Sequence, residues 1–245
     1  MGKPDLKNRT ESRKRLIVAA QRRNICRLRT SVINALIVTT LLFSACKGGG
    51  QEKKTVIPDV PEVSAPGLLF NGTNLEGWEI TNFGPQGPVY VSGGSIVLGM
   101  GDGCTGVTWK KDFPSDDYEV TLEAKRTQGT DFFCGMTFPV GKSPCTLVVG
   151  GWGGTLVGLS SINGRDASEN ETRTLRKFEN DQWYTIRLRV AGGAIKAWID
   201  DEMVVDFTIG DKLLTIRSEV ELSRPFGIAS WVTTAAIRNI RVERV

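Results

Sequence analysis

Hydrophobic and polar residues alternate in short runs from Leu68 to the end of the chain. The run 118–125 alternates without a break, which predicts a strand with one buried face and one polar face. The runs 183–190, 195–199 and 203–207 repeat this pattern and are separated by short turns. We therefore expect these three to form an antiparallel meander.

The rest of this region predicts further strands and almost no helix. A sustained 3.6-residue hydrophobic period is absent, and the segment 209–222 is at most a short turn of helix. Roughly a dozen strands and 28 glycines in the chain favour an all-β fold, an antiparallel jelly-roll sandwich. The further strands are expected at 89–91, 95–98, 106–109, 131–138, 145–149, 155–160, 226–230 and 235–245.

The N-terminal segment has the pattern of an export signal. A basic start precedes the apolar stretch 31–45, which is too short and too interrupted by polar residues to read as a membrane-spanning helix. Its end resembles the bacterial lipobox, in which small residues precede a cysteine that becomes lipid-modified, here Cys46. An ordinary signal peptide cut nearby, or an uncleaved anchor, stays open as the alternative.

The chain therefore divides into three parts. Residues 1–45 form the expected signal peptide with its lipobox, and residues 46–66 form a flexible tether rich in Gly, Lys and Pro. Residues 67–245 form one domain that is long enough for a substantial core. We expect an exported lipoprotein of the bacterial cell envelope, periplasmic or on the surface, that meets the membrane only through its lipid anchor.

The charge distribution argues against a nucleic-acid partner. The formal net charge is +4, but residues 1–45 hold ten basic and two acidic side chains, a balance of +8. The remainder of the chain therefore carries −4, which removes the basic surface that binding nucleic acid needs.

The residue types restrict the chemistry further. The chain has no histidine, which excludes histidine-based triads, histidine general bases and metal sites with histidine ligands. Two of the five cysteines lie in the N-terminal segment, which leaves Cys104, Cys134 and Cys145. A tight hairpin would place Cys145 opposite Phe138 rather than Cys134, so we expect three unpaired, mostly buried thiols.

All six tryptophans lie in the folded domain, where they can pack in the core or stack on sugar rings. Trp109, Trp183 and Trp198 stand within strand patterns, so we expect them to pack in the core. Trp152 stands among four glycines in the segment 150–154, which deny it local packing partners. Contact with a ligand and a role in a tight turn are both open for Trp152.

Two terminal motifs give the sequence a family resemblance. The segment 69–78 is similar to the "LFNGxxLxGW" opening of a large bacterial family associated with 3-keto-disaccharide hydrolase activity, also described as 3-keto-glycoside lyase and hydratase activity. The segment 237–242 resembles the last strand of the same family. The resemblance implies a concanavalin A-like sandwich, of the lectin and glucanase type, that acts on 3-keto-glycosides.

The chain also departs from the pattern of that family. Its members commonly carry an Asn-Ser-Gly step followed by Arg where this chain has 133–139, and a Gln and a His where it has 230–234. The role of that family histidine therefore cannot be carried over. Distinctive blocks stand in this chain at 131–135, 150–154, 166–172 and 219–225.

Elimination next to a ketone needs a base for the acidified C–H, a proton for the departing oxygen and polarisation of the ketone. The polar loop 164–176 offers Glu169 and Glu171 as catalytic carboxylates, with Asn170 and Arg173 as substrate-binding residues. A solvated charged loop without chemistry is the alternative interpretation of this segment.

The remaining candidates come from the other distinctive blocks. Glu221 is a third candidate catalytic carboxylate and Arg224 beside it a candidate substrate-binding residue, although surface pairing would also explain them. Asp131 and Trp152 are candidate substrate-binding residues. We assign no metal ligands and identify no cofactor, and a divalent cation stays open.

The sequence thus predicts a carbohydrate-active domain whose partner is a carbohydrate substrate or glycan. The leading hypothesis is a hydrolase or lyase that acts on 3-keto-glycosides by carboxylate acid–base chemistry. A non-catalytic, lectin-like glycan-binding module anchored to the cell envelope is the first alternative, and a structural envelope protein is the second.

Overall fold

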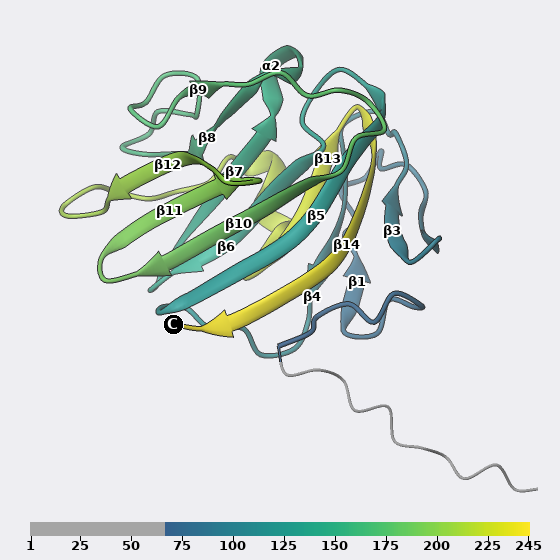
Figure 1. Ribbon diagram of the computed structural model, residues 1–245, viewed down its shortest axis with the longest axis horizontal. Coiled ribbons are helices and arrows are strands. Elements are labelled where there is room, and N and C mark those ends of the chain that lie inside the picture. The colour runs from purple at the N-terminus through teal and green to yellow at the C-terminus, as the bar shows by residue number, and fades with distance from the viewer. Residues whose placement is uncertain (1–66) are drawn as a thin grey trace, which may run out of the picture. The chain divides into compact units, whose positions relative to one another are not determined.

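A computed structural model describes residues 67–245, which form two seven-stranded antiparallel sheets packed face to face (Figure 1). The jelly-roll sandwich predicted from the alternation is confirmed. The first sheet, named here the β7 sheet, has the strand order β1 (Trp78–Ile80), β4 (Cys104–Trp109), β13 (Gly227–Trp231), β6 (Cys134–Val140), β7 (Ser143–Gly150), β8 (Leu156–Ser160) and β9 (Thr174–Leu175). The second, the β5 sheet, has the order β12 (Glu202–Thr208), β11 (Ala194–Ile199), β10 (Tyr184–Ala191), β5 (Tyr118–Gly129), β14 (Thr233–Arg244), β3 (Ser95–Leu98) and β2 (Val89–Ser92).

The core forms between the two sheets from every second residue of each strand. In β5, Val120 and Leu122 point inward and are fully buried, while the alternate residues Glu119, Thr121 and Glu123 lie half-buried on the outer face. Met136 and Leu147 supply the same burial from the β7 sheet. The period of two in the sequence predicted these strands because each side of a pleated strand meets a different environment.

Short elements are where the prediction and the structure differ. The strands β1 and β9 have only three and two residues, which is too few to show an alternating pattern. A 3₁₀ helix, η1 (Ser218–Ser223), lies at the end of the segment 209–222 and extends one residue beyond it, so the expectation of at most a short turn of helix there is confirmed.

The cysteines behave as the sequence predicted. The hairpin of β6 and β7 pairs Phe138 with Cys145 and Cys134 with Val149, so the two thiols are not opposite each other. Cys134, Cys145 and Cys104 are all buried and free. Burial raises the pKa of each thiol to about 12.

The prediction that three tryptophans pack in the core is right for Trp109 and wrong for Trp183 and Trp198. Trp109 is buried and meets Trp78 edge to face at 5.2 Å between ring centroids. Trp183 and Trp198 lie half-buried on the outer face of the β5 sheet, each under an arginine guanidinium 4.0 Å from the ring. The strand pattern did not distinguish the two faces because an aromatic ring beneath a cation is stable on the outer face as well.

The predicted signal peptide 1–45, the tether 46–66 and the proposed lipid anchor Cys46 lie outside the described residues. Within residues 67–245, no helix is long and apolar enough to cross a membrane.

Candidate functional site

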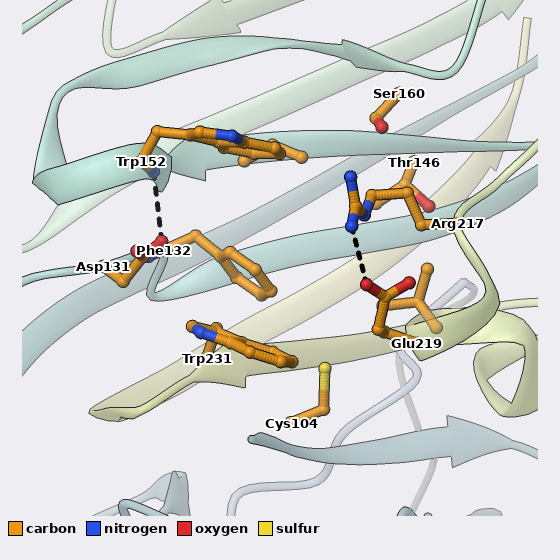
Figure 2. A pocket seen from close by; sticks show the side chains of 11 residues that line it. Cys104, Asp131, Phe132, Thr146, Trp152, Ser160, Arg217, Glu219 and Trp231 are labelled. Atoms are coloured by element: carbon orange, nitrogen blue, oxygen red, sulfur yellow. Dashed lines mark hydrogen bonds and ion pairs between the residues drawn. The ribbon is translucent and has the colours of Figure 1, made fainter. Parts of the chain in front are cut away.

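A pocket of about 230 Å³ opens on the outer face of the β7 sheet, between the turn that follows β7 and the segment that follows β12 (Figure 2). Aromatic side chains form one wall, an arginine and a glutamate form the facing wall, and small polar side chains close the space between them. The lining residues are Cys104, Asp131, Phe132, Thr146, Val148, Trp152, Ser160, Arg217, Glu219, Val220 and Trp231.

The aromatic wall is built by three connections between strands. Phe132 comes from the β5–β6 loop, Trp231 from the end of β13, and Trp152 from the turn after β7. The backbone N–H of Trp231 donates to the carbonyl of Phe132 at 3.0 Å, and their rings lie 6.5 Å apart between centroids. This backbone contact holds two of the three rings together.

Trp152 lies in a tight turn in which glycines stand on both sides of it. It lies in α2 (Gly151–Gly154), and both Trp152 and Gly153 have positive φ, as does Gly150 before them. A Cβ on Gly150 would lie 2.9 Å from the Phe133 ring, so a larger residue does not fit there. Of the two roles left open for Trp152, the tight turn is observed. Its ring lines the pocket and is 43% exposed, and contact with a ligand stays a prediction.

Asp131 fixes this turn to the aromatic wall. Its Oδ1 accepts hydrogen bonds from the backbone N–H of Phe132 at 2.7 Å and of Trp152 at 3.1 Å. Figure 2 shows the carboxylate below the backbone of Trp152. Asp131 therefore orients two of the three aromatic residues and also carries a negative charge at the pocket.

The polar wall consists of Arg217 and Glu219, from the start of η1. Nη2 of Arg217 donates to Oε1 of Glu219 at 2.7 Å, and Nη1 lies 3.3 Å from Oδ2 of Asp166. The hydrogen bond from Arg217 lowers the pKa of Glu219 below its usual value, and the same bond raises the pKa of Arg217. Both groups are thus charged at neutral pH.

Small side chains complete the lining. Thr146 and Ser160 project from β7 and β8 and are nearly fully buried, and the Thr146 hydroxyl shares a hydrogen bond of 2.9 Å with Thr137. The Cys104 thiol lies on β4, where burial and the nearby Glu219 carboxylate keep it protonated. These groups can donate and accept hydrogen bonds to ligand hydroxyls without adding charge.

Of the residues predicted from sequence, Trp152 and Asp131 line the pocket and lie together. Residues of the loop 164–176 that we expected to act on the substrate do not line it. Asn170 is buried, and its amide donates to the carbonyls of Leu159 on β8 and of Asp166 in the loop, while its side-chain oxygen accepts from the Thr172 backbone N–H. This amide holds the loop in shape.

The charged residues of that loop face solvent. Glu169 and Arg173 are exposed, and Glu171 lies 3.9 Å from Lys212 on the surface. The catalytic and binding roles predicted for these residues stay predictions. Their position outside the pocket does not support those roles.

Glu221 and Arg224 also lie outside the pocket, where they pair with each other at 2.6 Å and are both exposed. The helix η1 explains why Glu219 lines the pocket and Glu221 does not. A 3₁₀ helix has three residues per turn, so side chains two residues apart point in different directions. The block 219–225 was therefore selected correctly, but the register within it could not be read without knowing the helix type.

Sequence reasoning missed Arg217, Glu219, Trp231 and Phe132 as pocket residues. Phe132 and Trp231 stand in blocks where the chain departs from the family pattern, and that departure was the available signal. Arg217 stands two residues before the distinctive block 219–225, but only the folded chain shows its contact with Asp166, which lies 51 positions earlier in the sequence.

The described part of the chain offers no obvious metal centre. Among residues 67–245, no group of three or more Cys, Asp and Glu side chains is arranged to hold a metal ion. At the acidic turn after β11, Asp200 accepts from the Thr185 backbone N–H at 3.0 Å and pairs with Arg176 at 2.8 Å. These contacts belong to a structural turn.

Comparison with known proteins agrees with the fold. The sequence model of the 3-keto-alpha-glucoside-1,2-lyase-like domain matches residues 66–243. No curated protein matches the chain in sequence. Among solved structures, the Crh5 transglycosylase in complex with NAG is 15% identical, with 74% of this chain and 86% of that chain covered and a TM-score of 0.52.

Two further solved structures are similar to the chain. The apo Crh5 transglycosylase is 14% identical, with 71% of this chain and 80% of that chain covered and a TM-score of 0.50. The carbohydrate-binding module CBM66 from Bacillus subtilis is 18% identical, with coverages of 72% and 99% and a TM-score of 0.48. At these identities the likeness concerns the fold alone.

Proposed function

The chain belongs to the 3-keto-alpha-glucoside-1,2-lyase-like domain family, whose members are carbohydrate-active. From this premise we propose that its pocket cleaves 3-keto-glycosides by elimination. The observation that carries the proposal is the charged Arg217–Glu219 pair, which faces a wall of three aromatic rings (Figure 2). Aromatic rings bind the apolar faces of sugars, and a carboxylate beside a guanidinium can remove an acidified proton.

In the proposed reaction Glu219 takes the proton from the carbon that lies between the ketone and the anomeric carbon. That proton is acidic because the resulting negative charge is shared with the ketone oxygen. Arg217 stabilises this charge, since a guanidinium has five N–H donors and the contacts to Glu219 and Asp166 occupy two. As the C–C double bond forms, the bond between the anomeric carbon and the departing oxygen breaks.

The departing oxygen needs a proton, and Glu219 can return the one that it has just received. A single carboxylate then serves as base and acid in turn, so the chemistry needs neither a histidine nor a second titrating residue. Trp152, Phe132 and Trp231 would hold the sugar ring, and the buried hydroxyls of Thr146 and Ser160 would contact its polar edge.

The test is turnover of a 3-keto-glycoside with a chromogenic leaving group, measured with and without a chelator. We expect Glu219→Gln to lower kcat by about 10²- to 10⁴-fold, the usual contribution of general acid–base catalysis. Glu79→Gln is the matched control, because Glu79 is an exposed glutamate in a surface pair with Lys110. Full activity in Glu219→Gln would refute the assignment.

Glu221→Gln separates the pocket from the sequence-based hypothesis. The pocket places Glu221 outside the reaction, so this variant should retain activity, whereas the hypothesis from sequence expects its loss. Glu171→Gln gives the same comparison for the loop 164–176.

Glycan binding without cleavage is the second candidate, and one observation favours it. Glu219 already bonds to Arg217 and Ser218, and Oδ1 of Asp131 to two backbone amides, so both lining carboxylates are partly engaged. Saturable sugar binding with no turnover by the unmodified chain would establish this function instead. Absence of both binding and turnover would leave a structural role in the cell envelope.

A further inference from the structure

The charges around the pocket are unbalanced. Two lining residues, Asp131 and Glu219, are carboxylates, and Arg217 is the only cation among the lining residues. A third carboxylate, Asp166, contacts Arg217 from the other side at 3.3 Å. Three negative charges therefore surround one positive charge, which leaves a formal balance of −2 at the site.

The positive charge of Arg217 is already balanced by carboxylates of the chain. Its two terminal nitrogens are directed to carboxylates, Nη2 to Glu219 at 2.7 Å and Nη1 to Asp166 at 3.3 Å. Three of its five N–H donors remain for hydrogen bonds to ligand oxygens, but these two carboxylates more than offset its single positive charge. A negatively charged sugar would therefore meet the net negative field of the site.

The aromatic wall adds a second and independent observation. On the outer face of the β5 sheet, Trp183 and Trp198 each have a guanidinium 4.0 Å from the ring, so their faces are occupied by cations of the chain itself. Within the described residues, Trp152 and Trp231 have no cation over their rings. Their faces remain able to attract a cation from a ligand.

We propose that this pocket selects sugars by charge: it prefers a sugar with a free ammonium group, accepts a neutral one and rejects a sugar acid. The proposal deepens the function proposed above and rests on this pocket being the sugar site, whether the sugar is cleaved or only bound. Unpaired carboxylate charge and free aromatic faces are the two features that favour an ammonium group over a hydroxyl in the same position.

The experiment compares three methyl glycosides of one ring size, the glucoside, the glucosaminide with a free amine and the glucuronide. Their dissociation constants for the full chain, held in detergent, are measured by calorimetry at pH 6.5, where the amine is protonated. We expect the glucosaminide to bind at least about tenfold more tightly than the glucoside, which corresponds to about 1.4 kcal/mol. The glucuronide should bind at least tenfold more weakly than the glucoside.

Salt supplies a measurement that needs no substitution. Because ions screen the interaction of partly exposed charges, raising the salt from about 10 mM to about 1 M should shrink both differences several-fold. The affinity for the uncharged glucoside should stay within about twofold.

Two isosteric substitutions identify the carboxylates responsible. Asp131→Asn keeps an oxygen that accepts from Phe132 and Trp152, and Glu219→Gln keeps the side-chain length, so each removes charge and little else. Each variant should narrow the preference for the glucosaminide over the glucoside by about threefold or more. The controls are Asp206→Asn and Glu79→Gln, which remove exposed, surface-paired carboxylates outside the pocket and should leave the preference unchanged.

The outcomes separate this inference from the proposed function. If the glucoside binds and the charged sugars bind equally well, selection by charge is refuted while the sugar site stands. The same follows if the preference survives both isosteric variants. If none of the three glycosides binds, this inference fails together with the assignment of the pocket as a sugar site.

Discussion

The two glycines that follow Trp152 offer a sharp test of how the turn is held. Gly153 and Gly154 both have positive φ, +87° and +98°, so an alanine at either position is strained. A Cβ on Gly153 would meet nothing within 4 Å, whereas a Cβ on Gly154 would lie 2.7 Å from Nη1 of Arg126 and 3.0 Å from the Thr130 carbonyl oxygen. Arg126 is 8% exposed and bonds to the Phe178 carbonyl at 2.7 Å, so it has little freedom to move away.

These contacts set the expected magnitudes. Left-handed backbone costs an alanine about 1–2 kcal/mol, which is the whole effect expected for Gly153→Ala. Gly154→Ala adds the crowding against Arg126, and overpacking typically costs a further 1–3 kcal/mol. We therefore expect Gly154→Ala to lower the free energy of unfolding by about 2–5 kcal/mol in total.

The assay is urea unfolding of both variants, followed by tryptophan fluorescence and circular dichroism, with the free energy extrapolated to water. The difference between the two variants measures the crowding of the added Cβ against Arg126 and the Thr130 carbonyl, because the backbone strain is common to both. An equal loss of unfolding free energy in both variants would refute the argument that Arg126 leaves no room for a Cβ at position 154. Ligand affinity provides a second readout, since displacing the turn in Gly154→Ala should also move the Trp152 ring.

Three further predictions concern individual side chains. Arg217 holds the pKa of Glu219 below its usual value of 4.5, so the carboxylate stays ionised as the pH falls toward 4.5. In a plot of kcat/KM against pH, the loss of activity on the acid side should therefore lie below pH 4.5. A loss of activity near pH 6 would contradict the assignment of Glu219 as the base. With a pKa of about 12, Cys104 should react with a thiol reagent at pH 8 at least about 100-fold more slowly than a free cysteine, as measured by peptide mapping, and fast labelling in the folded protein would argue against its burial. If the lipobox prediction is right, Cys46→Ser should abolish incorporation of labelled fatty acid and move the chain from the membrane fraction to the soluble fraction.

Most of the sandwich could be predicted because its physical cause is local. The strand β5 alternates buried and half-buried side chains over its first nine residues, since one face meets the core and the other meets solvent. The apolar Val120 faces the core and the charged Glu119 faces outward, so the polarity of each side chain indicates its side of the strand. The very short strands β1 and β9 escaped prediction because pairing with their neighbours, and not an alternating sequence, defines them.

The candidate site was less predictable because its residues lie where chain segments meet. Glu219 and Asp166 are 53 positions apart in sequence, yet both contact Arg217. Only the folded loops bring these charges together, and no local pattern encodes their distance. Asp131 and Trp152 were found because each had a local signal, the first in a block that departs from the family pattern and the second among glycines.

The six tryptophans show which further property distinguishes a binding residue. Burial alone separates Trp78 and Trp109, which pack on each other in the core, from the others. It does not separate Trp198 from the pocket residue Trp231, because both are half-buried. The difference is that a guanidinium covers the face of Trp198, whereas the face of Trp231 borders a pocket that a ligand can enter. An exposed aromatic ring is thus a candidate for ligand binding only when the chain has not already placed its own cation against it, and in this protein that criterion directs attention to Trp152 and Trp231.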